Sequence, residues 1–251
     1  MPPSSMESVV LTVDVEQDCP PFLQTHQGVE EGLPQLLALF QQEGIQATFF
    51  CTGEAAERYP HEVRQIPAQG HELGCHGHSH KRFDRMQPEE AKAELTAAKR
   101  VLDALGASVI SFRAPNLALP EKYVKFIDEM GFTIDSSLAT YKPPFARSWS
   151  YQGRLLRIPA TVTSSILRLP SPIAWPILRR HPTPVLFVHP WEFIDMSRTR
   201  VRLDCRFNTG QKAISLLREA IRRFLDSGYR FVTLGEMGRQ IDAISKTAAR
   251  A

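Results

Sequence analysis

The chain has 251 residues, of which 43% are hydrophobic, enough to bury the core of one domain of ordinary size. Its 30 Lys and Arg residues nearly balance its 27 Asp and Glu residues, so it lacks the basic excess that is typical of proteins that bind nucleic acid. This composition argues against a disordered chain and against nucleic acid as a partner.

The first ten residues, MPPSSMESVV, lack the basic and apolar regions of a secretion signal. No stretch has the roughly 18 apolar residues that a membrane span needs. The cysteines are scattered without a C-x-x-C pair, which argues against a disulfide framework. These features together predict a cytoplasmic protein with reduced thiols.

The first predicted elements form a β-α-β unit. Residues 9–13 are an apolar, β-branched run that predicts a buried strand ending at a cluster of acids. Residues 33–43 have apolar side chains at helical spacing, and Gly44 follows as a helix terminator. Residues 46–51 predict the next strand.

The same alternation continues along the chain. Further strands are predicted at 71–73, 109–112, 132–135, 185–188 and 229–234, and helices at 88–105, 121–130 and 209–227. Alternating strands and helices of this length predict an α/β fold in which a parallel sheet with helical crossovers forms a closed or distorted (β/α) barrel. We expect one domain over residues 1–251.

Residues 141–184 interrupt this alternation because they are rich in proline, which does not fit inside a long helix. We expect an insertion that lies across the barrel mouth. Within it, residues 166–180 (ILRLPSPIAWPILRR) place apolar side chains among Arg168, Arg179 and Arg180. Such a segment could rest on an anionic membrane surface, and an ordinary packed lid is the alternative.

Three of the eight histidines fall within five residues, His76-Gly-His-Ser-His80, directly after a predicted strand. Imidazoles at positions i and i+4 can project to one side of a turn and share a divalent ion. His78 is expected to point elsewhere. The alternative is a solvent-exposed loop, because H-x-x-x-H also occurs by chance.

Three acids, Asp14, Glu16 and Asp18, alternate directly after the first predicted strand. Alternate side chains of an extended backbone lie on one face, so Asp14 and Glu16 can converge on one ion and its water. Acids this close repel one another unless a cation is present. The alternative is a solvated strand end.

These residues resemble the motifs of the polysaccharide deacetylases, also called the NodB-homology domain or carbohydrate esterase family 4. The second family motif, G-H-E-x-G-x-H-x-x-S-H, is matched closely by residues 70–80 (GHELGCHGHSH). The other motifs are similar to residues 12–14 (TVD), 113–115 (RAP), 135–137 (DSS) and 186–189 (LFVH). The resemblance covers residues 9–237.

The chain departs from the usual first motif, T-F-D-D, because Val15 replaces the second Asp. It matches a D-x-D/E variant in which the carboxylate lies two residues further on. The fifth motif continues as residues 189–192 (HPWE), which resembles a branch associated with exopolysaccharide or glycolipid assembly.

The resemblance implies a distorted, TIM-like (β/α) barrel of seven or eight strands. It also implies a metal-dependent hydrolase that removes an N-acyl group, most simply acetyl, from an amino sugar in a polysaccharide or a lipid-linked saccharide. Glu16, His76 and His80 would hold one divalent ion, with Zn²⁺ as first choice and Co²⁺, Ni²⁺ or Fe²⁺ as alternatives. Asp18 is the alternative carboxylate ligand.

The remaining motif residues are expected to handle protons. Asp14 would accept a proton from the attacking water, and His189 would give one to the leaving amine. Arg113 would pair with Asp14 and keep it ionised. Asp135 would orient His189, with a turn cap as its alternative role.

Two other functions stay open at this point: hydrolysis of a small non-sugar amide on the same fold, and a catalytically silent carbohydrate-binding protein. The intact set of motif residues argues against the second. The expected location is the cytoplasm, with peripheral contact at the inner face of the membrane if the substrate is lipid-linked. The sequence leaves the oligomeric state open.

Overall fold

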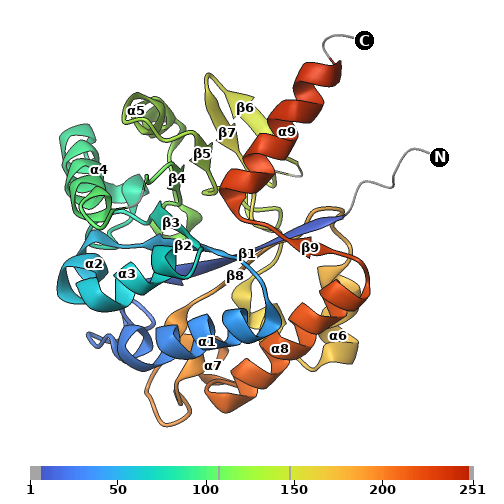
Figure 1. The fold of residues 1–251 in the computed structure, drawn as a ribbon. Helices are drawn as coiled ribbons and strands as arrows, with labels where there is room; N and C mark the ends of the chain where they lie inside the picture. Colours follow the sequence, from blue (N-terminus) through green and yellow to red (C-terminus); the bar gives the residue numbers. More distant parts are fainter. Residues whose placement is uncertain (1–6, 107, 147, 249–251) are drawn as a thin grey trace.

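The computed structural model describes residues 7–106, 108–146 and 148–248 (Figure 1). Its strands form one sheet in the order β6-β7-β5-β4-β3-β2-β1-β8, with β9 beside β1. All pairings are parallel except the β6–β7 hairpin. The first six residues, on which the predicted absence of a secretion signal partly rests, lie outside the described residues.

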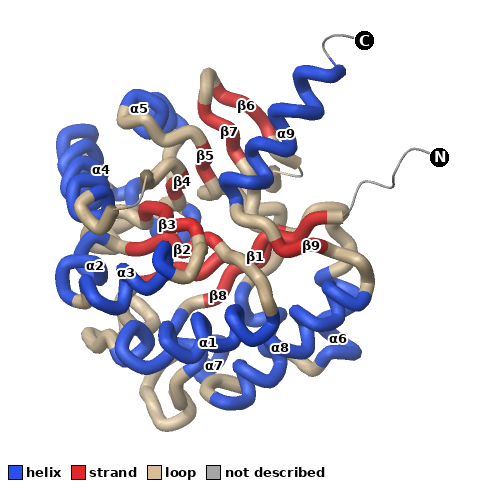
Figure 2. The backbone as a smooth tube through the Cα atoms, viewed as in Figure 1, coloured by secondary structure: helices blue, strands red, loops and turns tan. Residues whose placement is uncertain are grey.

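The strands are short, and the helices lie around them (Figure 2). The strands are β1 (Ser8–Val15), β2 (Thr48–Cys51), β3 (Glu72–Cys75), β4 (Ser111–Phe112), β5 (Ile134–Asp135), β6 (Ser150–Gln152), β7 (Leu155–Arg157), β8 (Val185–Val188) and β9 (Arg230–Phe231). The helices are α1 (Leu33–Glu43), α2 (Gly53–Arg58), α3 (Pro60–Ala68), α4 (Pro88–Asp103), α5 (Val124–Glu129), α6 (Ser171–Leu178), α7 (Leu203–Arg206), α8 (Gln211–Asp226) and α9 (Leu234–Ala248).

Strand β1 organises the sheet, because it pairs with β2 on one side and β8 on the other and is buried from Val9 onward. Its odd-numbered residues, such as Leu11 and Val13, belong to the core between the sheet and the outer helices. Its even-numbered residues face the other way, as the two-residue period of a strand requires. Val10 belongs to the interior core, together with Phe50 and Ile134.

The interior of the barrel changes character along β1. After Val10 the even-numbered residues are Thr12 and Asp14, and Glu16 continues the series just beyond the strand. At the opposite end, Leu234, Met237 and Ile241 of α9 pack against the interior core. The acids of β1 therefore lie at the mouth, at the carboxyl ends of the strands, where barrel enzymes place their sites.

The sheet also curls toward closure. Thr161, four residues after β7, donates its backbone N–H to the carbonyl oxygen of Val185 in β8 at 2.9 Å. This contact brings the segment after β7 to the far edge of the sheet. The predicted distorted (β/α) barrel is confirmed, with eight strands along the path and β9 added beside β1.

The expectation for residues 141–184 is wrong in part. Instead of lying wholly across the mouth, the segment supplies β6 and β7, and β7 pairs in parallel with β5. It then passes to the outer layer, where Trp175 of α6 packs edge-on against Phe224 of α8 at 5.0 Å. Prolines exclude a long helix but still permit three-residue strands and the eight-residue α6.

The side chains of residues 166–180 are divided between the interior and the surface. Leu167, Leu178 and Arg168 are buried, whereas Ile173, Arg179 and Arg180 are exposed. Across the described ranges, no helix combines the length and the apolar character needed to span a bilayer.

Candidate active site

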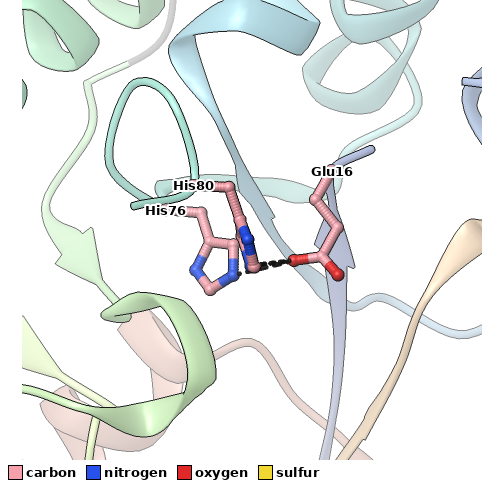
Figure 3. Close-up of side chains that lie close together, drawn as sticks. All are labelled: Glu16, His76 and His80. Carbon is pink, nitrogen blue, oxygen red and sulfur yellow. Dashed lines mark hydrogen bonds and ion pairs between the residues drawn. The ribbon is translucent and has the colours of Figure 1, made fainter. Parts of the chain in front are cut away.

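The structure brings Glu16, His76 and His80 together at the barrel mouth (Figure 3). His80 Nε2 lies 2.6 Å from Glu16 Oε2, and His76 Nε2 lies 3.2 Å from the same oxygen. One ligand atom from each residue falls within 4.8 Å of the others, a spacing that a single ion can bridge. The motif histidines and the strand-end acid therefore meet as expected, although 60 residues separate Glu16 from His76 in the sequence.

The chemistry of these residues suits a divalent metal ion. His76 Nδ1 lies 2.7 Å from the backbone oxygen of Arg113, to which it donates. Nε2 faces Glu16, and with an ion in place this nitrogen would offer its lone pair to the ion. Two imidazoles and one carboxylate are the ligand set of catalytic zinc sites that keep positions open for water.

Electrostatics within the cluster are consistent with cation binding. Burial works against ionisation of Glu16, but the charge of His80 and the hydrogen bonds with His76 and His80 hold the pKa of this carboxyl well below its ordinary value. Burial also lowers the pKa of His80, but the charge of Glu16 and its hydrogen bond to His80 together outweigh burial and raise that pKa. An ion at this position would replace the proton that the cluster shares.

The loop of residues 76–80, here called the histidine loop, is held by hydrogen bonds from α2 and from α4. The N–H groups of Gly53 and Glu54 in α2 donate to the carbonyl oxygens of Gly77 and His78 at 2.9 and 3.0 Å. From α4, Glu94 accepts hydrogen bonds from the N–H groups of His78 and Ser79, each at 2.9 Å. The histidine loop reaches these anchors from β3, so its shape does not depend on the ligands alone.

Two further features of this loop set the directions of its side chains. His80 has a φ of 56°, a left-handed backbone conformation that is uncommon for a residue with a side chain and occurs at functional sites. A Cβ on Gly53 would lie 2.1 Å from His78 Nδ1, so this glycine makes room for the His78 ring. His78 points away from the cluster toward Glu57, at 3.8 Å, as predicted.

Asp14 pairs with Arg113, and this prediction is confirmed. Arg113 Nη1 lies 2.7 Å from Asp14 Oδ1, and the arginine is completely buried. The guanidinium also donates to Thr12 Oγ1 at 2.7 Å and to Ser136 Oγ at 2.9 Å, and it stacks over the ring of Phe50 at 4.4 Å. These contacts fix the arginine, which in turn fixes one carboxylate oxygen of Asp14.

His189 stands on the other side of Glu16, with Nε2 at 3.9 Å from Glu16 Oε1. Its Nδ1 lies 2.6 Å from Glu192 Oε1. Burial lowers the pKa of His189, but the hydrogen bond to Glu192 and the charge of Glu16 together raise it to about 9. His189 is therefore held as a proton donor that faces the cluster with Nε2.

Asp135 contacts Ser137 and Arg157 instead of His189, so its alternative predicted role, a turn cap, is the one that the structure supports. Its carboxylate lies 2.9 Å from Arg157 Nε and accepts hydrogen bonds from the backbone and hydroxyl of Ser137. The position expected of Asp135 is taken by Glu192, three residues after the histidine. Asp135 instead compensates a buried arginine on the neighbouring strand β7, which the DSS motif alone does not reveal.

Glu192 is itself completely buried and forms an ion pair with Arg168, whose Nε lies 2.9 Å from Glu192 Oε2. Burial opposes ionisation of Glu192, yet the charges of Arg168 and His189 keep its pKa below the ordinary value. The sequence signals Glu192 through the HPWE motif. It gives no signal for Arg168, which lies 24 residues earlier in the proline-rich segment.

Asp18 is excluded as the carboxylate ligand by its own contacts. It accepts hydrogen bonds from Thr25 Oγ1 at 2.7 Å and from the N–H groups of Gln27 and Gly28 at 2.8 and 2.9 Å. These bonds occupy both carboxylate oxygens and close the loop before α1. The acid at the ion position is Glu16.

The cluster opens into a cavity of about 250 Å³. Asp14, Glu16, His80 and His189 line it together with Tyr141 and Trp191. Trp191 is almost fully buried and stacks on the ring of His189, with centroids 4.8 Å apart. Trp191 therefore supports the imidazole and also contributes to the lining of the cavity.

The fold and the site together define a (β/α) barrel protein with a candidate metal site at its mouth. The family model for polysaccharide deacetylase matches residues 3–134, more than half of the 251 residues, and the chain belongs to this family.

Individual relatives match over shorter stretches. A peptidoglycan-N-acetylglucosamine deacetylase of Bacillus cereus is 30% identical over 105 residues, 41% of this chain and 38% of that protein. A peptidoglycan deacetylase of Helicobacter pylori is 30% identical over 127 residues, 48% of this chain and 43% of that protein. The chain thus spans less than half the length of these two curated relatives.

A solved structure of a Mycobacterium smegmatis protein assigned to the polysaccharide deacetylases matches 97% of this chain and 93% of its own, with a TM-score of 0.76. The sequence identity is 20%, so this likeness is one of fold.

Proposed function

We propose that the chain is a metal-dependent hydrolase that removes the N-acetyl group from an amino sugar. The observation that carries the proposal is that a carboxylate and an imidazole, each fixed by a partner, lie beside the candidate metal ligands. Asp14 is fixed by Arg113, and His189 is fixed by Glu192, with Glu16, His76 and His80 between them.

The residues divide the reaction between them. A divalent ion held by Glu16, His76 and His80 would acidify a water molecule and polarise the amide carbonyl of the substrate. Asp14, with one oxygen tied to Arg113, has its other oxygen available to accept a proton from the attacking water. His189, protonated on both nitrogens, gives its Nε2 proton to the departing amine while Nδ1 stays bonded to Glu192.

An N-acetylated amino sugar in a polymer is the substrate class that family membership favours, since the curated relatives are named as deacetylases of peptidoglycan and of chitooligosaccharides. Zn²⁺ is our first choice of ion, and Co²⁺, Ni²⁺ and Fe²⁺ also accept this ligand set. A lipid-linked sugar and a cytoplasmic location stay proposals. Peripheral membrane contact also stays a proposal, because Ile173, Arg179 and Arg180 of the segment 166–180 are exposed whereas Trp175 packs against Phe224.

The test is release of acetate from N-acetylchitotetraose by the purified chain supplied with Zn²⁺. We expect turnover that a chelator abolishes and that the metal restores. Turnover that survives chelation would contradict a metal-dependent reaction. A chain that binds the saccharide and the metal without releasing acetate would instead be a silent carbohydrate-binding protein.

A small non-sugar amide is the second candidate, because a cavity of about 250 Å³ can enclose a small molecule. Assays of cyclic and ureide-type amides beside the chitooligosaccharide separate the two candidates. Faster turnover of the small amides would favour the second.

A further inference from the structure

A second cavity, of about 530 Å³, continues from the active-site cavity on the side of His80. Pro20, His80 and Asn116 line both spaces, so the two cavities are neighbours. A saccharide with one unit at the metal cluster can place the neighbouring unit here. Apart from His80, the side chains that line this space have no part in the proposed reaction.

The charges in this second cavity are unequal. Its charged lining consists of the metal ligand His80, three cations, Lys81, Arg82 and Arg85, and one acid, Glu90. Lys81 lies 3.3 Å from Glu90, and both side chains are exposed, so this pair is weak. Arg82 makes two hydrogen bonds to Asp84, at 2.9 and 2.6 Å, which compensate part of its charge.

Arg85 is the least compensated of these cations. It is exposed and, over the ranges 7–106, 108–146 and 148–248, it has no carboxylate oxygen within 4.0 Å. It is close enough to Asp84 to contribute to the lowered pKa of that carboxyl, after the larger effect of Arg82. The excess of positive charge thus stays available to a ligand.

A fourth cation stands where the two cavities meet. Lys142 lines the active-site cavity and donates from Nζ to the backbone oxygen of Asn116 at 2.7 Å. Burial lowers the pKa of Lys142, and the charge of Arg82 lowers it further. Two cations held close enough to repel each other are relieved by an anion placed between them.

The backbone beneath the cations is firmly held. Phe83 is completely buried and packs edge-on against Phe112, with centroids 5.6 Å apart. The hydroxyl of Tyr123 donates to the backbone oxygen of Met86 at 2.6 Å. Residues 81–86 therefore need little ordering when a ligand binds, which favours affinity.

We infer that the second cavity is a substrate subsite that takes an anionic group, carboxylate or phosphate, on the saccharide unit next to the one that is deacetylated. This inference rests on the proposed function and narrows its substrate class. The subsite selects acidic polymers over neutral ones through Arg85, Arg82, Lys81 and Lys142.

The experiment compares two forms of one oligosaccharide in which N-acetylglucosamine alternates with glucuronic acid: the free acid and its neutral methyl ester. We expect kcat/KM for the acid to exceed that for the ester by about 5- to 20-fold at low ionic strength. The preference should largely disappear in 0.5 M NaCl, where charges about 10 Å apart are screened. An arm with N-acetylchitobiose 1-phosphate distinguishes phosphate from carboxylate as the preferred group.

Variants connect the preference to the subsite. The acid-to-ester ratio of kcat/KM should fall about 3- to 10-fold in Arg85→Gln, because one accessible cation is removed. Arg64→Gln is the matched control, since Arg64 is an exposed arginine of α3 that lines neither cavity, and its ratio should not fall.

The possible outcomes distinguish failure of the subsite from failure of the proposed function. Equal rates on acid and ester, or an unchanged ratio in Arg85→Gln, overturn the subsite while leaving deacetylation intact. No acetate from either oligosaccharide or from N-acetylchitotetraose overturns the proposed function itself.

Discussion

Asp14 and Glu16 leave β1 on the same face with one residue between them, yet they have different partners. Asp14 contacts Arg113, whereas Glu16 contacts the two histidines. We therefore expect Asp14→Asn to keep its metal while kcat falls by about 10² to 10⁴, because an amide cannot accept the proton. Glu16→Gln should lose metal affinity instead. Metal content measured beside single-turnover rates checks both expectations.

Asp18→Asn is the control for this pair, since Asp18 belongs to the loop before α1. It should keep its metal and most of its rate. An empty site in Asp14→Asn together with a full site in Glu16→Gln would reverse the two assignments.

The bond between His189 and Glu192 predicts a pH dependence. An acid whose pKa is about 9 is protonated below that pH, so the rate should fall as the pH rises through the pKa. Glu192→Gln removes the charge that raises this pKa while it keeps an oxygen for Nδ1 to bond. The alkaline limb of the kcat profile should therefore move to lower pH.

A bound cation also lowers the pKa of His189, so the wild type and the variant are compared with the same ion loaded. Asp135→Asn serves as the control, because Asp135 pairs with Arg157 and does not touch His189. An alkaline limb that moves in Asp135→Asn and stays in Glu192→Gln would restore the role predicted from the sequence.

At the scale of elements, the turn after His189 packs directly on the π-helical segment Gly28–Gly32, which precedes α1. A Cβ on Gly32 would lie 2.1 Å from the backbone oxygen of Pro190. Gly32→Ala must therefore displace one backbone from the other, at a cost of about 1 to 3 kcal/mol. We expect a lower free energy of unfolding and a reduced kcat, measured by denaturation and by steady-state kinetics.

Gly44→Ala is a contrasting variant, because Gly44 ends α1 at a φ of 64° with open space around it. It should cost about 1 to 2 kcal/mol through backbone strain and leave kcat near normal. If Gly32→Ala and Gly44→Ala lowered kcat equally, the loss would reflect general destabilisation and not the packing of this turn.

The elements that the sequence predicts well are those with a continuous apolar pattern. The strand 185–188 and the helix 33–43 match the structure at both ends. The pattern fails where elements are only a few residues long, as for β6 and β7, because three residues are too few to establish a period of two. It also misses α2 and α3, which lie between two recognised motifs.

The candidate site likewise contains residues that the sequence predicts and partners that it does not. Residues within local motifs, such as His76, His80 and Arg113, meet as predicted because the carboxyl ends of parallel strands meet at one edge of a sheet. Partners that depend on long-range packing were not predictable. The sequence predicts a contact between Asp135 and His189, but Asp135 pairs with the buried Arg157 of β7, a strand that the proline-rich segment does not reveal.

For the whole molecule, the core and the metal cluster are separate. The two larger apolar clusters lie around and inside the barrel, whereas the ligands occupy its mouth. Chelation should therefore leave the circular dichroism spectrum unchanged. It should lower Tm by roughly 5 to 10 °C relative to a sample with the ion at about 100 times its dissociation constant. Loss of helical signal on chelation would show that folding itself needs the ion.

The double anchoring of the histidine loop by α2 and Glu94 has a consequence for exchange of the ion. A loop that keeps its shape without the ion allows one ion to leave and another to enter with no refolding step. Stripped protein should then accept Co²⁺ within the time of mixing, and the visible absorption of cobalt would report on the geometry of the ligands. Removing the Glu94 carboxylate would convert this prompt uptake into a slow process limited by rearrangement of the loop.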